Sequence, residues 1–112
     1  MGNPPTFPVV DDALLAQLVA RMRRAADPQK IILFGSRARG DAGPHSDIDL
    51  LVIEESDLPR YKRSARYRRA LVGLFPAKDI VVWTPGEVEE WRSVPNAFIT
   101  TALREGRVLY EA

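Results

Sequence analysis

Two aspartates separated by one residue open the segment of the sequence that is best able to do chemistry. Asp47 and Asp49 stand before the apolar run Leu50 to Ile53, which predicts a buried strand over residues 47–53. Alternate residues of a strand share a face, so both carboxylates should project to one side, roughly 6–7 Å apart along the strand. Two like charges in such a strand are costly, and a divalent cation would offset their repulsion. Hard oxygen ligands of this kind suit Mg²⁺ or Mn²⁺.

A third aspartate is expected at the same end of the sheet. Asp79 precedes the apolar run Ile80 to Trp83, which predicts another strand. A predicted helix separates this strand from the one that carries Asp49, so the two strands should be parallel neighbours joined by a crossover. Three carboxylates gathered there can hold two metal ions, which clamp the attacking and leaving oxygens of an in-line displacement. The alternative interpretation of Asp79 is an aspartate that merely begins a strand.

A glycine and a serine, Gly35 and Ser36, follow a strand predicted over residues 31–34. Glycine lets a bulky anion approach the backbone, and the free amides at the start of a helical turn bind phosphate. Such a turn suits the outer phosphates of a nucleoside triphosphate, although a Gly-Ser pair alone predicts only a turn. Arg37 and Arg39 each fit either a phosphate contact or a solvated loop, and we favour Arg39 as the nucleotide contact.

Taken together, these residues resemble a known signature. Residues 35–52, GSRARGDAGPHSDIDLLV, resemble the motif of the polymerase-β-like nucleotidyltransferases, in which Gly-Ser, ten residues and Asp-x-Asp follow one another. The local form GSRARGD is similar to the minimal nucleotidyltransferase (MNT) branch, which includes the MntA-like antitoxins of HEPN/MNT toxin–antitoxin pairs. The resemblance spans residues 12–110, and the third carboxylate falls where that family places its last metal ligand.

The resemblance implies a role for each of these side chains. It makes Asp47, Asp49 and Asp79 the catalytic residues and the metal ligands. The first two bridge both metal ions, and the third binds the metal ion beside the attacking group. The Gly35-Ser36 turn and Arg39 become the nucleotide-binding residues.

The remaining sequence predicts the elements that position these residues. The chain has 112 residues, the size of one domain, so we expect a flexible segment over residues 1–10 and a single nucleotidyltransferase domain over residues 11–112. Helices are predicted over residues 12–26, 58–75 and 96–104 and from Pro85, and strands over residues 31–34, 47–53, 79–83 and 108–110. This order predicts a mixed α/β (α+β) fold, and the resemblance likewise implies a small mixed sheet backed by helices.

Details of these elements are also predicted. Asp11 or Asp12 should cap the first helix, and Asn96 the last. The helix over residues 58–75 should turn its apolar residues, Leu58, Tyr61, Ala65, Val72 and Phe75, to one side. The aromatic residues Trp83, Trp91, Phe98 and Tyr110 are expected in the core or at an interface rather than against a base.

The resemblance also implies an activity and a partner. Members of the MNT branch transfer AMP from ATP to a tyrosine of a helical HEPN-type protein and silence it. We therefore expect a protein adenylyltransferase that acts as an antitoxin. A chain of this length has little room for the second domain with which larger relatives hold an acceptor. Two alternatives stay open: nucleotide transfer to a small molecule such as an antibiotic, and a non-catalytic nucleotide-binding antitoxin that neutralises its partner by occlusion.

Composition and charge indicate which further partners, covalent cross-links and cellular location to expect. The formal net charge of +1 does not indicate a nucleic acid. Residues 60–69 nevertheless hold six basic side chains, which form a solvated helix face, a partner surface or a contact to a nucleic-acid backbone. Cysteine is absent, which excludes disulfides and thiolate metal sites. No apolar run approaches the roughly 20 residues of a membrane span, and the first residues do not resemble a signal peptide, so we expect a cytoplasmic protein. An oligomer is left open.

Overall fold

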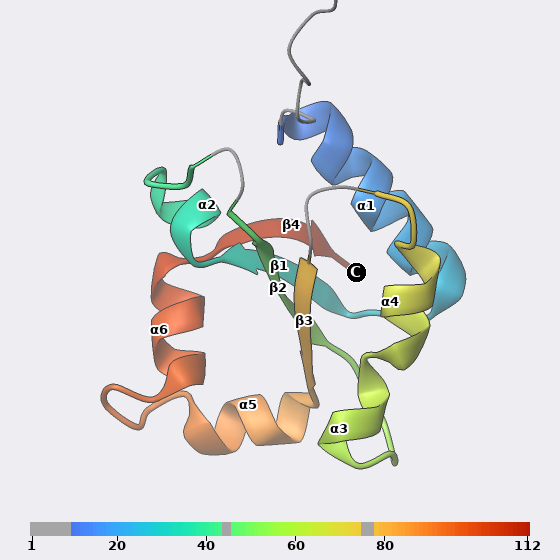
Figure 1. Cartoon of the computed structure of the whole chain (residues 1–112). Helices are drawn as coiled ribbons and strands as arrows, with labels where there is room; N and C mark the ends of the chain where they lie inside the picture. Colours follow the sequence, from blue (N-terminus) through green and yellow to red (C-terminus); the bar gives the residue numbers. More distant parts are fainter. Residues whose placement is uncertain (1–9, 44–45, 75–77) are drawn as a thin grey trace, which may run out of the picture.

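A four-stranded sheet with helices on both faces positions the residues singled out above (Figure 1). The computed structural model describes residues 10–43, 46–74 and 78–112. The segment expected to be flexible, residues 1–10, therefore lies outside the described residues apart from Val10. In chain order the elements are α1 (Asp12–Ala25), β1 (Lys30–Phe34), α2 (Ser36–Arg39), β2 (Ile48–Ile53), α3 (Arg60–Arg63), α4 (Ala65–Ala70), β3 (Lys78–Trp83), α5 (Pro85–Trp91), α6 (Phe98–Glu105) and β4 (Arg107–Glu111).

The strands lie in the order β3-β2-β1-β4. β2 and β3 are parallel, as the helical connection between them predicted, whereas β1 is antiparallel to both β2 and β4. The parallel pair therefore begins at one end of the sheet, where β1 ends. The mixed α/β architecture predicted from the sequence is confirmed.

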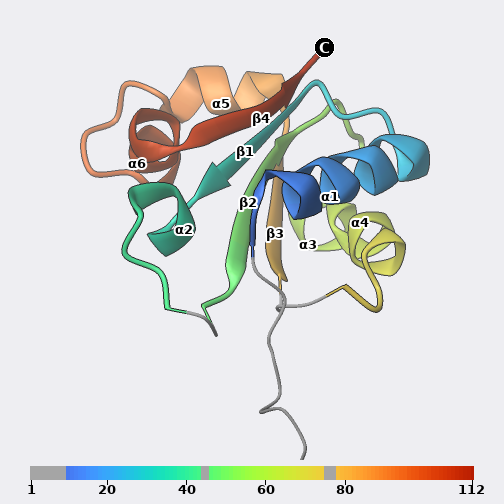
Figure 2. The same cartoon turned by 90° about the horizontal axis from the view of Figure 1, so that it is seen from above.

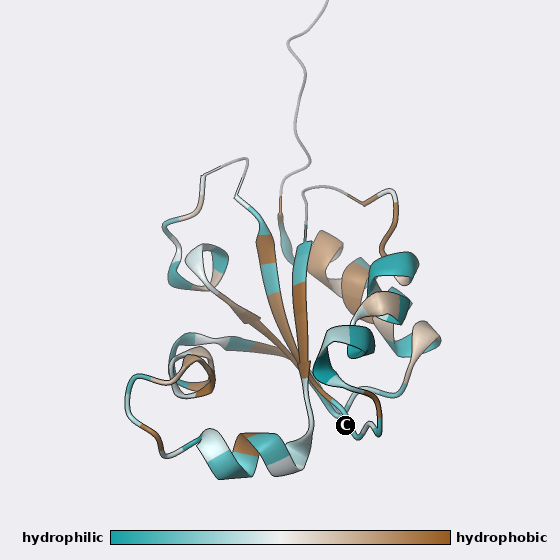
Figure 3. Cartoon of the chain, turned by 60° about the horizontal axis from the view of Figure 1, so that its bottom comes forward, coloured by the Kyte–Doolittle hydropathy of each residue, from teal (hydrophilic) through white to brown (hydrophobic). Residues whose placement is uncertain are grey.

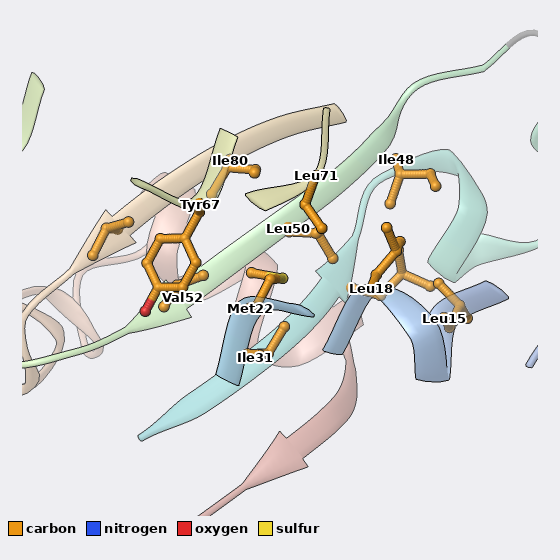
Figure 4. Packing of buried hydrophobic residues seen from close by; sticks show 12 residues of the cluster. Leu15, Leu18, Met22, Ile31, Ile48, Leu50, Val52, Tyr67, Leu71 and Ile80 are labelled. Carbon is orange, nitrogen blue, oxygen red and sulfur yellow. The ribbon is translucent and has the colours of Figure 1, made fainter. Parts of the chain in front are cut away.

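α1 and α4 cover one face of the sheet (Figures 2 and 4). Leu18 and Met22 of α1 and Tyr67 of α4 are fully buried there against Leu50 of β2. Burying one such side chain contributes roughly 1.5–3 kcal/mol to folding. This layer is the larger of two apolar clusters and anchors the N-terminal helix to the centre of the sheet.

α6 packs on the opposite face. Ile99 and Ala102 of α6 are buried against Ile32 of β1 and Leu51 of β2. Since apolar clusters cover both of its faces, β2 is almost continuously apolar, as Figure 3 shows for the central strands. Asp49 is the exception within β2, and it is half-buried.

Two helices begin as sequence rules require. The Asp11 carboxylate accepts a hydrogen bond from the backbone N–H of Leu14 at 2.9 Å and caps α1. Thr84 and Glu87 form a reciprocal capping box at the start of α5, where Pro85 takes the first helical position. The predicted starts of these two helices are confirmed.

The single helix predicted over residues 58–75 is wrong. Two short helices, α3 and α4, meet at Ser64, and the second ends at Ala70. The side chains of Leu58, Tyr61 and Val72 are 46, 78 and 73% exposed, and Phe75 lies outside the described residues. The break at Ser64 directly follows Arg63, whose buried side chain bonds to Leu58 and Glu87 rather than lying on a solvated face.

The cap predicted for the last helix is also wrong. α6 begins at Phe98 after Ala97, which makes no side-chain cap. Asn96 instead adopts a positive φ of 62°, a left-handed turn that asparagine tolerates better than most residues. Asn96 therefore turns the chain before α6 instead of capping it.

Candidate active site

Asp49 and Asp79 lie side by side where the parallel pair begins. They are direct register partners of β2 and β3, so their side chains project to the same face of the sheet. This is the face that carries Leu51 and α6. Asp47 directly precedes β2 and is exposed, as is Asp79. The parallel pairing predicted from the sequence thus brings two of the three predicted ligands together.

The three carboxylates influence one another electrostatically. Burial raises the pKa of Asp49, and the negative charges of Asp79 and Asp47 raise it further. The positive charge of Arg39 acts in the opposite direction on the pKa of Asp49. The four charged residues of the predicted site therefore share one electrostatic environment, in which the carboxylates repel one another.

Gly35 sits directly against Asp49. Its φ of 74° and ψ of −156° belong to a region that is almost restricted to glycine. A Cβ placed on Gly35 would overlap Oδ2 of Asp49 and lie 3.1 Å from its Cγ. Glycine is therefore required twice at this position, for the backbone conformation and for the space that the carboxylate occupies. Ser36 follows Gly35 as the first residue of α2.

The two arginines of α2 have different roles. Arg37 donates to the backbone carbonyl of Ser46 from Nε at 3.0 Å and from Nη2 at 2.8 Å, and so holds the chain immediately before Asp47. Arg39 forms ion pairs with Asp41 and Glu105 at 3.3 and 3.8 Å. Sequence reasoning missed the role of Arg37, because no pattern in the sequence indicates a bond to a loop carbonyl.

The donor set can be compared with the needs of a divalent cation. In the described part of the chain, no group of three or more His, Cys, Asp or Glu side chains is arranged to hold a metal ion as it stands. The residues nevertheless fit Mg²⁺ or Mn²⁺, because carboxylate oxygens are the ligands these ions prefer. In addition, Asp49 and Asp79 share a face of the sheet, and a cation would relieve the repulsion between their charges. Binding would require the carboxylates of Asp47, Asp49 and Asp79 to turn toward one another.

The basic run at residues 60–69 is only partly a solvated face. Arg63 is 7% exposed and donates to the carbonyls of Leu58 and Val82 and, at 2.6 Å, to the carboxylate of Glu87. Arg60 also pairs with Glu87. The run therefore fastens α3 to α5, and its exposed basic residues are Arg60, Lys62, Arg68 and Arg69.

The contact between Arg63 and Glu87 predicts an acid-sensitive fold. Burial alone would raise the pKa of Glu87, but hydrogen bonds from Arg63, Thr84 and Arg60 lower it to about 2. A lowered pKa means that the carboxylate stabilises the fold above about pH 4.5 and that this contribution is lost as the pH falls toward about 2. Glu87→Gln should therefore lower the free energy of unfolding at pH 7 by about 2–3 kcal/mol.

Urea unfolding between pH 2 and 7 measures this effect. The stability difference between the parent and Glu87→Gln should shrink steadily below pH 4.5. Glu89→Gln is the matched control, because Glu89 pairs with Arg92 on the surface and should contribute little. An equal difference at pH 7 and pH 2.5 would show that Glu87 is not the responsible group.

No helix among the described residues is long and apolar enough to cross a membrane.

Comparisons with known proteins identify the family and the fold of the chain. The nucleotidyltransferase domain family matches residues 15–108, a span that contains the Gly35-Ser36 turn and all three aspartates. No curated protein matches the chain. Among solved structures, a candidate nucleotidyltransferase from Sulfolobus solfataricus is 26% identical, with a TM-score of 0.56 over 70% of this chain and 71% of that chain.

Two structural neighbours below 25% identity share the fold. One is a toxin–antitoxin complex with AMP-PNP, 22% identical, with a TM-score of 0.63 over 92% of this chain and 75% of that chain. The other is a complex of an MNT antitoxin with the tri-AMPylated HEPN toxin of Shewanella oneidensis, 20% identical, with a TM-score of 0.60 over 89% and 71%. With the family match extending over most of the sequence, the chain belongs to the nucleotidyltransferase domain family.

Proposed function

We propose that this nucleotidyltransferase moves AMP from ATP to a hydroxyl group of a HEPN-type helical protein, in the cytoplasm, and acts as its antitoxin. The observation that carries the proposal is the placement of Asp49 beside Asp79 and against Gly35. This arrangement sets a carboxylate pair next to a turn suited to phosphate, which are the two parts that phosphoryl transfer requires.

Each part has a defined task in the proposed reaction. Asp47, Asp49 and Asp79 would hold Mg²⁺ or Mn²⁺, which, when bound, neutralises charge on the triphosphate. The amides beside Gly35 and the Ser36 hydroxyl would hold the outer phosphates. The acceptor oxygen forms a bond to the α-phosphorus of ATP. At the same time the bond breaks between this phosphorus and the oxygen that bridges it to the β-phosphorus. Pyrophosphate leaves with the electron pair, and the hydroxyl proton passes to the Asp79 carboxylate or to water.

The choice of acceptor draws on the structural neighbours. One neighbour is an MNT antitoxin in complex with an AMPylated HEPN toxin, and another is a toxin–antitoxin complex with AMP-PNP. Their fold is shared by this chain at low identity, so they support both an adenine nucleotide and a protein acceptor. A tyrosine is the acceptor side chain that we propose.

The test combines the purified chain, ATP, Mg²⁺ and the protein product of the neighbouring gene. The intact mass of that protein should increase by one or more AMP units, and omission of ATP or addition of EDTA should prevent the increase. Neutralisation of the toxin without any mass increase would contradict the proposal and favour occlusion. Modification of an antibiotic instead of the protein would favour the small-molecule alternative.

A further inference from the structure

The aromatic side chain of Phe98 is exposed beside Phe34, a residue that shares a face of the sheet with Asp49. Phe34 at the end of β1 is the direct register partner of Asp49, so the two side chains share a face of the sheet. The ring of Phe98 packs edge-on against the ring of Phe34, with centroids 5.2 Å apart and an interplanar angle of 79°. Phe98 was expected in the core or at an interface, yet it is 43% exposed.

The packing of α6 on the sheet does not depend on the exposed part of the Phe98 ring. Ile99 and Ala102, at 0 and 2% exposure, already anchor α6 to the sheet. Trp83, the other aromatic neighbour of Phe98, is covered by the guanidinium group of Arg60 at 4.2 Å from its ring. Phe98 therefore presents apolar aromatic surface that its own fold leaves uncovered within the described residues.

The surroundings of Phe98 combine two chemistries. Asp49 and Asp79 provide negative charge on this face of the sheet. Val81, two residues after Asp79 on the same face of β3, is half-buried in the apolar cluster against which α6 packs. A ligand that fits both parts has a charged end that reaches the carboxylates through a cation and a flat aromatic end. A nucleoside triphosphate has both.

We propose that Phe98, supported by Phe34, stacks on the base of the bound nucleotide. This inference rests on the proposed function, because it assumes that a nucleoside triphosphate binds at the carboxylates. Stacking on an aromatic ring is largely independent of the base, since every base has a π-face. Loss of the ring should weaken ATP and GTP binding alike, by roughly tenfold.

Binding of ATP and of inorganic tripolyphosphate in Mg²⁺, measured by calorimetry, separates the base from the phosphates. Phe98→Ala should weaken ATP binding roughly tenfold and leave tripolyphosphate binding at the parent value. Phe98→Trp should keep ATP affinity. Phe98→Leu retains apolar bulk without a ring, so it should fold like the parent and still lose ATP affinity. Tyr61→Ala, which removes a 78% exposed ring from α3, is the matched control and should bind like the parent.

The outcomes distinguish this inference from the proposed function. Parent-like ATP binding by both Phe98→Ala and Phe98→Leu would overturn the stacking role, and so would equal losses of ATP and tripolyphosphate binding. Unchanged ATP binding together with slower modification of the partner protein would assign the ring to the acceptor instead. If the parent binds neither ATP nor tripolyphosphate, the proposed function fails as well.

Discussion

Replacing Asp49 with Asn is expected to reduce AMP transfer more than about 100-fold, because loss of even the outer partners of a metal site costs 10–100-fold. The side chain keeps its shape and loses the charge that would hold a divalent cation. Initial rates are measured from the mass of the partner protein or from released pyrophosphate. Asp79→Asn should reduce the rate similarly, since Asp79 is the register partner of Asp49.

The same substitution should not weaken the fold. Burial and the charges of Asp79 and Asp47 oppose ionisation of Asp49, so its carboxylate is unfavourable for folding at neutral pH. The melting temperature of Asp49→Asn should therefore equal or exceed that of the parent. Asp57→Asn, at an exposed position in the loop after β2, is the control and should keep the parent rate. Near-parent transfer by Asp49→Asn would remove Asp49 from the list of metal ligands.

Replacing Gly35 with Ala should cost both stability and nucleotide binding. The strained backbone conformation costs about 1–3 kcal/mol, which lowers the melting temperature by roughly 5–15 °C. The added methyl group would also displace Asp49, whose Oδ2 it overlaps. Calorimetric melting and ATP titration measure the two effects.

Two further variants distinguish the backbone strain at residue 35 from the steric overlap of the added methyl group with Asp49. Gly73→Ala is the matched control, because Gly73 has a φ of 88° but no described atom within 4 Å of an added Cβ. It should be destabilised and keep ATP binding. In an Asp49→Ala background, the destabilisation by Gly35→Ala should fall by about 1 kcal/mol or more, since the colliding carboxylate is gone. An unchanged destabilisation there would show that Gly35 and Asp49 do not interfere.

The arrangement of the site could be predicted where local periodicity determines it. The alternation of Asp47 and Asp49 follows from strand geometry, and the helix between two strands predicted that Asp79 would lie beside Asp49. The sequence did not show that Gly35 contacts Asp49, because this depends on the antiparallel pairing of β1 with β2. A glycine in a sequence indicates a turn but not its neighbour.

The errors in the predicted elements arise from contacts between residues that are distant in sequence. Arg63 is basic and was assigned to a solvated face or a partner surface, but its acceptor, Glu87, is distant in sequence and pulls it inward. The predicted helix is divided at Ser64, directly after this arginine. Likewise, a final strand was predicted without its partner, and β4 pairs with β1 at the edge of the sheet.

The pairing of β4 with β1 also determines where a label or a surface attachment can be placed. At the start of β4, Arg107 pairs with Leu33, close to the Gly35 turn. At its end, Glu111 pairs with Lys30, and the N–H of Ala112 donates to the carbonyl of Gln29 at 2.9 Å. A fluorophore or immobilisation tag joined after Ala112 therefore leaves from the end of β1 remote from the carboxylates, whereas an insertion at the turn between α6 and β4 would disturb them.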